Sequence, residues 1–408
     1  TLDVMVIADN GANASVLESA GIKSAGMLIA VTQSDEVNMI ACMLAKQYRV
    51  SITVCRIRNN GFADQSSVLT PKQLGIDFVI NPERIAAFEI SKMLHFPDAS
   101  EVEYFGRGNV MLLGVVVGKE TDITDRPLAE LPLIPGCIIV GISDPNGKFI
   151  VPGGEDVIRP GNKIYLLGST RTLKDISSLL HHEKTRLNQV TILGGGMIGM
   201  QLAKLLEESK RSFTVKLIEK NEERCEELCC HLDRTLILQG DATEIAMLRE
   251  EETDQADAII AVTGDDRNNI VVALLARQFG IKKIICEVMK PQFVPVYSAL
   301  GIDSVINPRL LAVSQIIRLT LREEVVAFSI LQDENAEVFE LVLPGSARVA
   351  HKKIVDAKFP RGMLIGSIVR QDEVIIPNGN TVLLPEDHLV IFVLTAISAK
   401  LDRFFAPT

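Results

Sequence analysis

The sequence has no long apolar run, no basic cluster and no C-x-x-C pair, and each absence excludes a class of protein. No apolar stretch approaches the roughly 18 residues that a membrane-spanning helix needs, so no transmembrane segment is expected. Lys and Arg occur at most in short pairs, and the net charge is −10 at pH 7. Since binding to phosphates of nucleic acid requires concentrated positive charge, nucleic acid is not expected as the main partner. The 408 residues, 47% of them hydrophobic, are typical of a soluble globular protein with several domains.

The seven cysteines are odd in number and irregularly spaced, which does not indicate a disulfide framework. Cys225 and Cys229 are one helical turn apart and His231 is near, so a metal site there is conceivable. No second pair of ligands accompanies them, and reduced thiols in a reducing cytosol are the favoured interpretation. We therefore assign no metal site.

The clearest motif is a glycine-rich turn between a predicted strand and a predicted helix. The apolar run 190–193 precedes Gly194, Gly196 and Gly199 in G-x-G-x-x-G spacing, and a helical pattern follows. In such motifs the first glycine permits the tight turn, the second lets the backbone approach a pyrophosphate, and the third allows close packing of helix on strand. Free N–H groups at the helix start then face the phosphate. The motif predicts a dinucleotide site; a glycine-rich turn that binds nothing is the alternative.

An acidic residue stands where such a site requires one. Glu219 ends the next apolar run, twenty residues after Gly199. There a carboxylate can accept hydrogen bonds from the adenosine ribose hydroxyls, and it would repel a 2′-phosphate. NAD or NADH is therefore expected in preference to NADP. The neighbouring Lys220 could instead attract a phosphate of ATP or ADP.

The chain also repeats itself. The segment AVTQSDEVN at 30–38 recurs as AVTGDDRNN at 261–269, and LGIDFVINP at 74–82 recurs as LGIDSVINP at 300–308. A period this long indicates a duplicated domain and not a solenoid of short repeats.

Comparison of the two copies indicates an N-terminal truncation. Thr1 corresponds to Leu232, whereas the second copy begins near Asn188. The missing residues would carry the glycine loop and the acidic residue of the first copy. In a doubly wound sheet the first two strands lie at the centre, so residues 1–98 are expected to form an incomplete sheet and the natural protein to be longer.

Within each copy, short apolar runs alternate with helical spacing, which implies a parallel sheet covered by helices. Strands are expected at 4–8, 27–31 and 52–57 in the first copy, and at 235–238, 258–262 and 283–288 in the second. Helices are expected over 35–47 and 266–278. Asn81-Pro82 and Asn307-Pro308 are expected to start further helices, with Asn as the cap and Pro at the first helical position.

Each α/β copy is followed by a segment of a different kind, rich in Val and Ile and punctuated by Pro and Gly. These segments match each other over 134–168 and 359–393, and hairpin turns are expected at Asn146-Gly147 and Asn378-Gly379. The sequence leaves open whether these α+β modules hold a second small ligand or a divalent ion at a dimer interface, or only contact one another. The expected domains are a partial Rossmann-like domain over 1–98, an α+β module over 99–184, a complete Rossmann-like domain over 185–322 and a second α+β module over 323–408.

With this order, the chain resembles the RCK (KTN) family, and within it the TrkA regulatory subunits of Trk-type bacterial potassium uptake systems. The resemblance covers essentially the whole chain. It rests on ILGGGMIG at 192–199, GDAT at 240–243, the two AVT-x-x-D-x-x-N runs and the tandem C-terminal modules. It implies tandem RCK-N and RCK-C domains and a nucleotide-binding regulator without enzymatic activity. It also implies a homotetramer in the cytoplasm, peripheral on the inner face of the membrane, with a membrane-embedded potassium transporter subunit of the TrkH/TrkG type as partner.

The resemblance also implies nucleotide contacts at matching positions of the second copy. The phosphates would be cradled by Gly194, Gly195, Gly196, Met197 and Ile198, and the ribose would be held by Glu219. Asp241 and Ala242 would lie beside the adenosine, and Thr263 and Gly264 over the base.

In the first copy, Thr32 and Gln33 are the counterparts of Thr263 and Gly264. Arg56, on the position of Glu287, could pair with phosphate. The run at 9–11 departs from the pattern of the second copy, so the first copy as given is not expected to bind nucleotide. Thr32 and Thr263 could also simply end strands.

Two other functions remain open. A dehydrogenase would need a proton-transfer group near the nicotinamide, but all six histidines lie outside the dinucleotide motifs and no Tyr precedes a Lys by four residues. No catalytic residue is therefore assigned. A regulator of a potassium channel or of an efflux antiporter is the other alternative. The duplicated order favours the uptake-system regulator, because channel-linked relatives usually carry one pair of domains.

Overall fold

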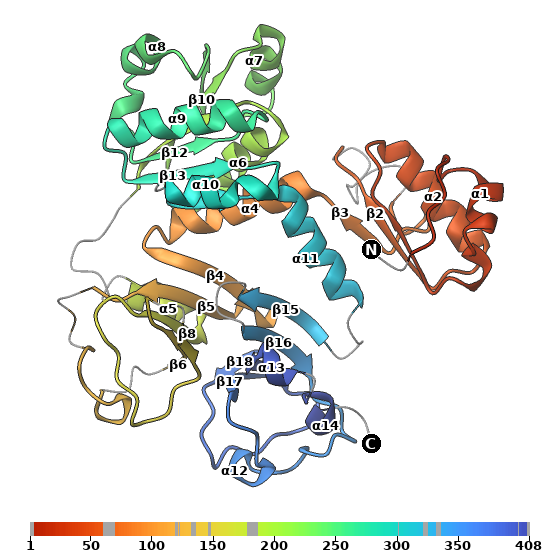
Figure 1. Ribbon diagram of the computed structural model, residues 1–408, viewed down its shortest axis with the longest axis vertical. Helices are drawn as coiled ribbons and strands as arrows, with labels where there is room; N and C mark the ends of the chain where they lie inside the picture. The colour runs from red at the N-terminus through yellow and green to blue at the C-terminus, as the bar shows by residue number, and fades with distance from the viewer. Residues whose placement is uncertain are drawn as a thin grey trace. The chain divides into compact units, whose positions relative to one another are not determined.

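The computed structural model describes residues 4–59, 70–118, 121, 123–131, 136–145, 148–177, 187–300, 302–320, 325–331, 336–398 and 400–405. The chain divides into two compact units, and each unit contains residues from both repeats. The α/β unit combines 1–91 with 188–316, and the antiparallel unit combines 92–187 with 317–408. The predicted fold class is confirmed: parallel, Rossmann-like sheets, the first incomplete, each followed by a small α+β module (Figure 1).

The second copy of the α/β fold has a six-stranded sheet in the order β11-β10-β9-β12-β13-β14, drawn in green to cyan in Figure 1. All of its strand pairs are parallel. The chain runs outward from the central β9 in one direction and then returns to β12 on its other side, which creates a topological switch point between β9 and β12. The strands are β9 (Gln189–Leu193), β10 (Thr214–Glu219), β11 (Leu236–Gln239), β12 (Ala258–Ala261), β13 (Lys283–Glu287) and β14 (Ser304–Ile306).

The helices of this copy begin where local capping predicts. The side chain of Asp265 accepts hydrogen bonds from the N–H groups of Arg267 and Asn268 at the start of α9, and Asn307 accepts from Leu310 N at the start of α11. The predicted helix over 266–278 and the helix start at Pro308 are therefore confirmed. The helices are α6 (Met197–Glu208), α7 (Glu222–Cys229), α8 (Ile245–Glu250), α9 (Asp266–Gln278), α10 (Val294–Ala299) and α11 (Pro308–Thr320).

The first copy forms a parallel sheet of only three described strands, β1 (Met27–Ala30), β2 (Ile52–Arg56) and β3 (Phe78–Ile80). Its helices are α1 (Ala14–Ser19), α2 (Asp35–Gln47) and α4 (Pro82–His95). Helix α2 has the predicted bounds and is capped by Ser34, whose side chain accepts from Val37 N. Helix α4 starts at Pro82 behind Asn81, as predicted.

The strand predicted at 4–8 is wrong, because these residues form no strand. Val4, Met5 and Val6 are 64%, 71% and 82% exposed. Their counterpart in the second copy, β11, is hydrogen-bonded only to β10. Among the described residues of the first copy, the sheet consists of β1, β2 and β3, and no strand pairs with this apolar segment to form a ladder.

The antiparallel unit contains two five-stranded sheets with the same strand order, β4-β5-β8-β6-β7 and β15-β16-β19-β17-β18. The first consists of β4 (Ala99–Phe105), β5 (Val110–Val116), β6 (Cys137–Ser143), β7 (Phe149–Ile150) and β8 (Lys163–Ser169), followed by α5 (Thr170–Ser177). The second consists of β15 (Val325–Leu331), β16 (Ala336–Val342), β17 (Met363–Arg370), β18 (Glu373–Ile375) and β19 (His388–Leu394). Its short helices are α12 (Ile354–Ala357), α13 (Thr395–Ser398) and α14 (Asp402–Phe405).

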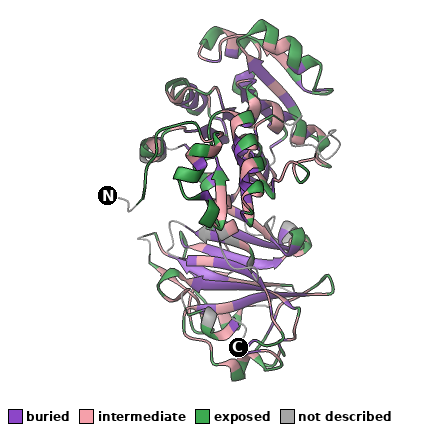
Figure 2. Cartoon of the chain, turned by 90° about the vertical axis from the view of Figure 1, so that its right-hand side faces the viewer, coloured by how far each residue is buried: buried purple, intermediate pink, exposed green. Residues whose placement is uncertain are grey.

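The two antiparallel sheets share one hydrophobic core. A single cluster of buried residues joins Val110, Tyr165 and Leu167 of the first sheet to Val338 and Phe392 of the second. Figure 2 shows the buried residues of this unit concentrated along its strands. The sequence left open whether the α+β modules hold a small ligand, hold a divalent ion or contact one another. The structure shows that the two modules contact one another directly.

One hairpin turn differs from its prediction. The turn between β17 and β18 lies at Gln371 and Asp372, whose φ angles are 51° and 67°, and not at Asn378-Gly379, which follows β18. Positive φ at both central residues matches the twist of a two-residue hairpin, and Asp tolerates this region better than most residues. The other predicted turn, Asn146-Gly147, lies outside the described residues. Among the helices of the described segments, none is long and apolar enough to cross a membrane.

Candidate nucleotide-binding site

The predicted site residues of the second copy gather at one edge of the parallel sheet. Gly194 follows β9, Glu219 ends β10, Asp241 is two residues beyond β11, and Thr263 is two residues beyond β12. Because the strands are parallel, their carboxyl ends meet at the same edge, and the switch point between β9 and β12 is the place where open α/β sheets bind ligands. The structure therefore brings these four segments together.

The glycine loop has a geometry that requires glycine at its ends and is open in its middle. Gly194 has φ +112°, and a Cβ there would lie 2.5 Å from the carbonyl oxygen of Val262. A Cβ on Gly199 would overlap the carbonyl oxygen of Gly194. A Cβ on Gly196, in contrast, would meet no atom within 4 Å. The loop is thus pressed against β12 and α6, while its middle glycine leaves space for a ligand.

The start of α6 offers unsatisfied donors at this open position. Gly196 is the N-cap of the helix and has no side chain that could accept from the first turn. The N–H groups of Met197 and Ile198 therefore have no intrahelical acceptor. Free N–H groups and the positive end of the helix dipole make this point suitable for a phosphate.

Glu219 is held directly against the loop. Its Oε2 accepts a hydrogen bond of 2.7 Å from Gly195 N, and its Oε1 accepts one of 2.9 Å from Asn221 N. Each carboxylate oxygen can accept a further hydrogen bond. A ribose hydroxyl can thus be bound without breaking either backbone contact, so the residues present fit an adenosine ribose.

Lys220 and Asp241 form an ion pair across neighbouring strand ends. Lys220 Nζ lies 2.7 Å from Asp241 Oδ2, and 77% of the lysine side chain is exposed. The hydrogen bond from Lys220, followed by those from the hydroxyl and N–H of Thr243, lowers the pKa of Asp241 to about 2. An exposed pair of this kind contributes little to stability, so an incoming phosphate could recruit the lysine. The adjacent Ala242 is buried in the hydrophobic core of this copy.

Thr263 is bound by a buried asparagine that the sequence analysis did not identify. Asn269 Oδ1 accepts from Thr263 N (3.0 Å) and from its hydroxyl (2.8 Å), and Asn269 Nδ2 donates to Glu287 O (3.0 Å). This side chain ties the ends of β12 and β13 together. The signal was present in the sequence, because Asn269 is the last residue of the repeated AVT-x-x-D-x-x-N run.

The first copy contains the same arrangement. Asn38 Oδ1 accepts from Thr32 N (2.8 Å) and from its hydroxyl (2.7 Å), and Asn38 Nδ2 donates to Arg56 O (3.0 Å). Both asparagines are almost fully buried. Thr32 and Thr263 therefore have at least a structural role as strand ends.

A second residue that the sequence analysis missed is Arg224, in the first half of α7. Its Nε donates to the carbonyl oxygen of Gly195 (2.7 Å), and its Nη1 lies 2.6 Å from Glu227 Oε2. The guanidinium thus adds positive charge beside the glycine loop. Nothing in the sequence distinguishes this arginine, since its contact depends on the turn between β10 and α7.

The predicted residues of the first copy have other partners. Arg56 Nη2 lies 3.1 Å from Glu83 Oε1, and the carbonyl oxygen of Gln33 accepts from Arg58. Within the described residues, no hydrogen bond or ion pair joins Thr32, Gln33 or Arg56 to the glycine loop. The conceivable metal site at Cys225, Cys229 and His231 is likewise not assembled: across the described segments, no cluster of three or more such ligands occurs.

Glu287, the counterpart of Arg56, is a buried carboxyl group at the end of β13 and is 5% exposed. Burial, and then the negative charges of Asp266 and Glu83, raise its pKa from 4.5 to about 7, against the opposing effect of a hydrogen bond from Gly264 N. The carboxyl therefore gains and loses its proton at a pH far above the usual range for glutamate.

We expect this carboxyl to make stability depend on pH. A carboxyl whose pKa is higher in the folded state than in the unfolded state stabilises the fold at low pH. This contribution is lost as the pH rises from about 4.5 to about 7, and the free energy of unfolding falls by up to roughly 3 kcal/mol over that range. Chemical denaturation of wild type and Glu287→Gln between pH 5 and 8 measures this. The difference between the two should grow with pH in favour of the variant, whereas the exposed Glu250→Gln should follow wild type. Parallel profiles for wild type and Glu287→Gln would contradict the assignment.

Comparison with solved structures supports the fold. The GsuK RCK domain matches with a TM-score of 0.60 at 21% identity, over 98% of this chain and 85% of that one. The GsuK channel bound to NAD matches with a TM-score of 0.60 at 21% identity, over 98% of this chain and 70% of that one. At this identity the likeness concerns the fold alone.

Comparison with protein families and individual sequences is more specific. The TrkA-N domain family matches residues 1–82 and 190–308, and the TrkA-C domain family matches residues 112–181 and 338–406. The Trk system potassium uptake protein TrkA homolog 1 of Methanosarcina mazei is 32% identical over 99% of this chain and 91% of its own length. The TrkA homolog of Archaeoglobus fulgidus is 33% identical over the same shares, and TrkA of Azorhizobium caulinodans is 32% identical over 99% of this chain and 89% of its own. The chain, with TrkA-N and TrkA-C domains in tandem, therefore belongs to the TrkA family of Trk system potassium uptake proteins.

Proposed function

We propose that this protein is a nucleotide-binding regulatory subunit that gates a membrane potassium uptake transporter, and that it is not an enzyme. The observation that carries the proposal is the glycine loop of the second copy, with Glu219 fixed against it by the hydrogen bond from Gly195 N. The names of its relatives connect the family with potassium uptake. The domains would be those expected from the sequence, with the nucleotide site in 185–322.

The ligand we propose is NAD or NADH, with ATP or ADP as alternatives at the same site. Glu219 has acceptor capacity for ribose hydroxyls and disfavours a 2′-phosphate. The open backbone at Gly196 and the first turn of α6 would hold the phosphates. One relative in fold is a channel bound to NAD, which agrees with the choice of a dinucleotide.

Regulation would follow from differential binding. A ligand shifts a conformational equilibrium only as far as its affinities for the two states differ. We propose that the assembly is a homotetramer peripheral to the cytoplasmic face of the membrane, and that its partner is a transporter subunit of the TrkH/TrkG type. Nucleotide binding in the second copy would bias the assembly between two states that the transporter distinguishes.

Potassium flux through the reconstituted transporter tests this function. With wild-type protein, flux should change when NADH, NAD⁺, ATP or ADP is added. With Glu219→Gln, the response should require roughly tenfold more nucleotide, because one charged acceptor for the ribose is lost. Glu222→Gln removes the same charge from an exposed position in α7, and this variant should respond as wild type does. A flux that no nucleotide alters would contradict the proposal.

A further inference from the structure

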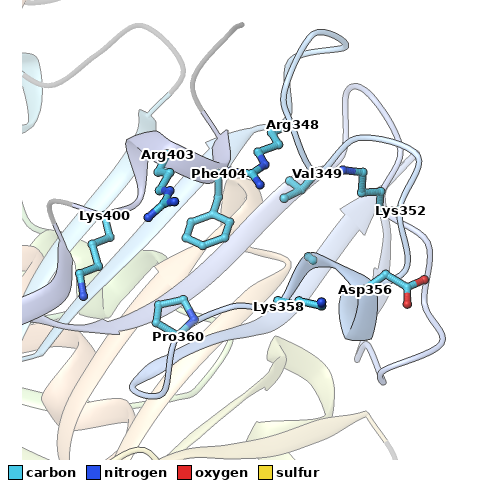
Figure 3. A pocket seen from close by; sticks show the side chains of 10 residues that line it. Arg348, Val349, Lys352, Asp356, Lys358, Pro360, Lys400, Arg403 and Phe404 are labelled. Atoms are coloured by element: carbon cyan, nitrogen blue, oxygen red, sulfur yellow. The ribbon is translucent and has the colours of Figure 1, made fainter.

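The second antiparallel module contains a pocket lined by five cationic side chains. Its volume is about 490 Å³, within the range of small-molecule sites. Figure 3 shows Arg348 and Lys352 on one side of the hollow, Lys358 and Pro360 on the other, and Arg403 beside the ring of Phe404 at one end. Lys400 is the fifth cation of the lining.

This concentration of positive charge is unusual for this chain. The module 323–408 has eight Lys and Arg residues in an acidic protein of net charge −10, and five of the eight line this pocket. None of the five forms an ion pair with an acid among the described residues. The only acid in the lining is Asp356, and Figure 3 shows its carboxylate pointing away from the hollow. Converging cations repel one another, so a bound anion would relieve this repulsion.

The cations come from three separate places in the module. Arg348 and Lys352 lie between β16 and α12, Lys358 directly follows α12, and Lys400 and Arg403 lie at the C-terminal helices. Multiple donors on separate segments can surround an anion that carries several charges. One run of surface lysines could not do this.

One wall of the pocket is aromatic. Phe404 is half-buried and packs against Phe359, with ring centroids 5.2 Å apart. Phe359 in turn stacks on Phe405 at 5.6 Å. The ring of Phe404 is therefore held in place and offers a flat apolar surface next to the charges.

The first module provides an internal comparison. Pro127–Val157 and Lys353–Val382 form isolated β-bridges at equivalent places in the two modules, so the loops that contain Pro127 and Lys353 correspond to each other. Strands β8 and β19 hold equivalent places in their sheets, so the segments that follow them also correspond. In the aligned sequence of the first module, the residues at these five positions are Asp122, Arg126, Pro132, Asp175 and Ser178. A cation thus recurs at only one of the five positions, that of Lys352, so the fold of such a module does not require the other four, and the concentration of five cations belongs to the second module.

We propose that this pocket binds a small soluble polyanion with two or more phosphate groups and a flat or apolar part that lies against Phe404. The site belongs to the second module alone and is distinct from the glycine loop. A ligand at this second site would act on the protein independently of nucleotide binding at Glu219.

Calorimetric titration of the full chain with inorganic tripolyphosphate at low salt tests the charged part of the site. The double variant Lys352→Ala/Arg403→Ala should bind tripolyphosphate at least roughly tenfold more weakly, since hydrogen bonds to charged groups are lost. The matched double variant Lys353→Ala/Arg361→Ala removes two exposed cations of the same module outside the lining and should remain within about twofold of wild type. Equal losses in both variants, or no binding to wild type, would overturn the proposal.

Two further arms separate this site from other phosphate binders. Arg224→Ala, beside the glycine loop, should leave tripolyphosphate binding at the pocket unchanged. If Arg224→Ala abolishes binding and the pocket variant does not, the anion binds at the loop and the proposal is overturned.

Sedimentation with vesicles of phosphatidylglycerol and phosphatidylcholine should not depend on the pocket cations. A loss of vesicle binding in the pocket variant, without tripolyphosphate binding to wild type, would make the pocket a membrane contact and would also overturn the proposal.

Discussion

Replacing Phe392 by alanine is expected to lower the free energy of unfolding of the antiparallel unit by about 3–5 kcal/mol. The side chain is fully buried in β19, in the core that both antiparallel sheets share. Its ring stacks on Phe149 at 5.7 Å and lies 6.4 Å from Tyr165, both in the first sheet. Truncation therefore removes contacts within one sheet and between the two sheets at once. Denaturant unfolding followed by tyrosine fluorescence measures the loss.

A matched exposed substitution controls for the general effect of shortening a side chain. Val355 in α12 is 62% exposed, so Val355→Ala should change the unfolding free energy by less than about 0.5 kcal/mol. If Phe392→Ala behaved like Val355→Ala, the two sheets would not share the core described above. Separate unfolding transitions for the two modules in wild type would contradict it as well.

Replacing glycines of the loop at 194–199 is expected to have the second large effect, and two positions should behave differently. Gly194→Ala places a Cβ 2.5 Å from Val262 O at φ +112°, so it should cost about 1–3 kcal/mol of stability and abolish nucleotide binding. Gly196→Ala meets no protein atom within 4 Å, so it should fold normally yet bind nucleotide far more weakly, because its methyl group occupies the approach of the phosphate. Thermal unfolding and calorimetry on the same samples separate these effects.

Gly26→Ala provides the control for these variants. Its Cβ would also meet open space and its φ is not positive, and it lies in the first copy. It should leave both stability and nucleotide binding nearly unchanged. Tight nucleotide binding by Gly196→Ala would contradict the placement of phosphate at the start of α6.

The parts of the fold that the sequence predicted correctly are those determined locally. Helices α2 and α9 have their predicted bounds because Ser34 and Asp265 cap them and apolar spacing continues to the end. The strand predicted at 4–8 failed because a strand requires a partner that is distant in sequence. The hairpin turn at Gln371-Asp372 was missed because Asn-Gly is the stronger turn signal in a sequence. The position of the turn is determined by the pairing of β17 with β18, in which Arg370 lies opposite Glu373.

The candidate site likewise has residues that the sequence predicts and residues that it does not. The glycine loop and Glu219 could be placed from the sequence because a strand, a turn and a helix determine their geometry, and parallel strands end at one edge. Arg224 could not, because its contact with Gly195 depends on how α7 returns toward the loop. The basic pocket was also invisible, since its five cations are scattered over 348–403 and the sequence has no basic run.

Calorimetric titration with NADH, NAD⁺, ATP and ADP tests the central claim most directly, in wild type, Glu219→Gln and the control Glu222→Gln. The account predicts that wild type and Glu222→Gln bind at least one of these nucleotides with equal affinity. Glu219→Gln should bind it more weakly by about 1–3 kcal/mol, because a hydrogen-bonded charge at the ribose is removed. Equal binding by all three proteins would contradict the placement of the ribose at Glu219, and no binding by wild type would contradict the nucleotide-gated account itself.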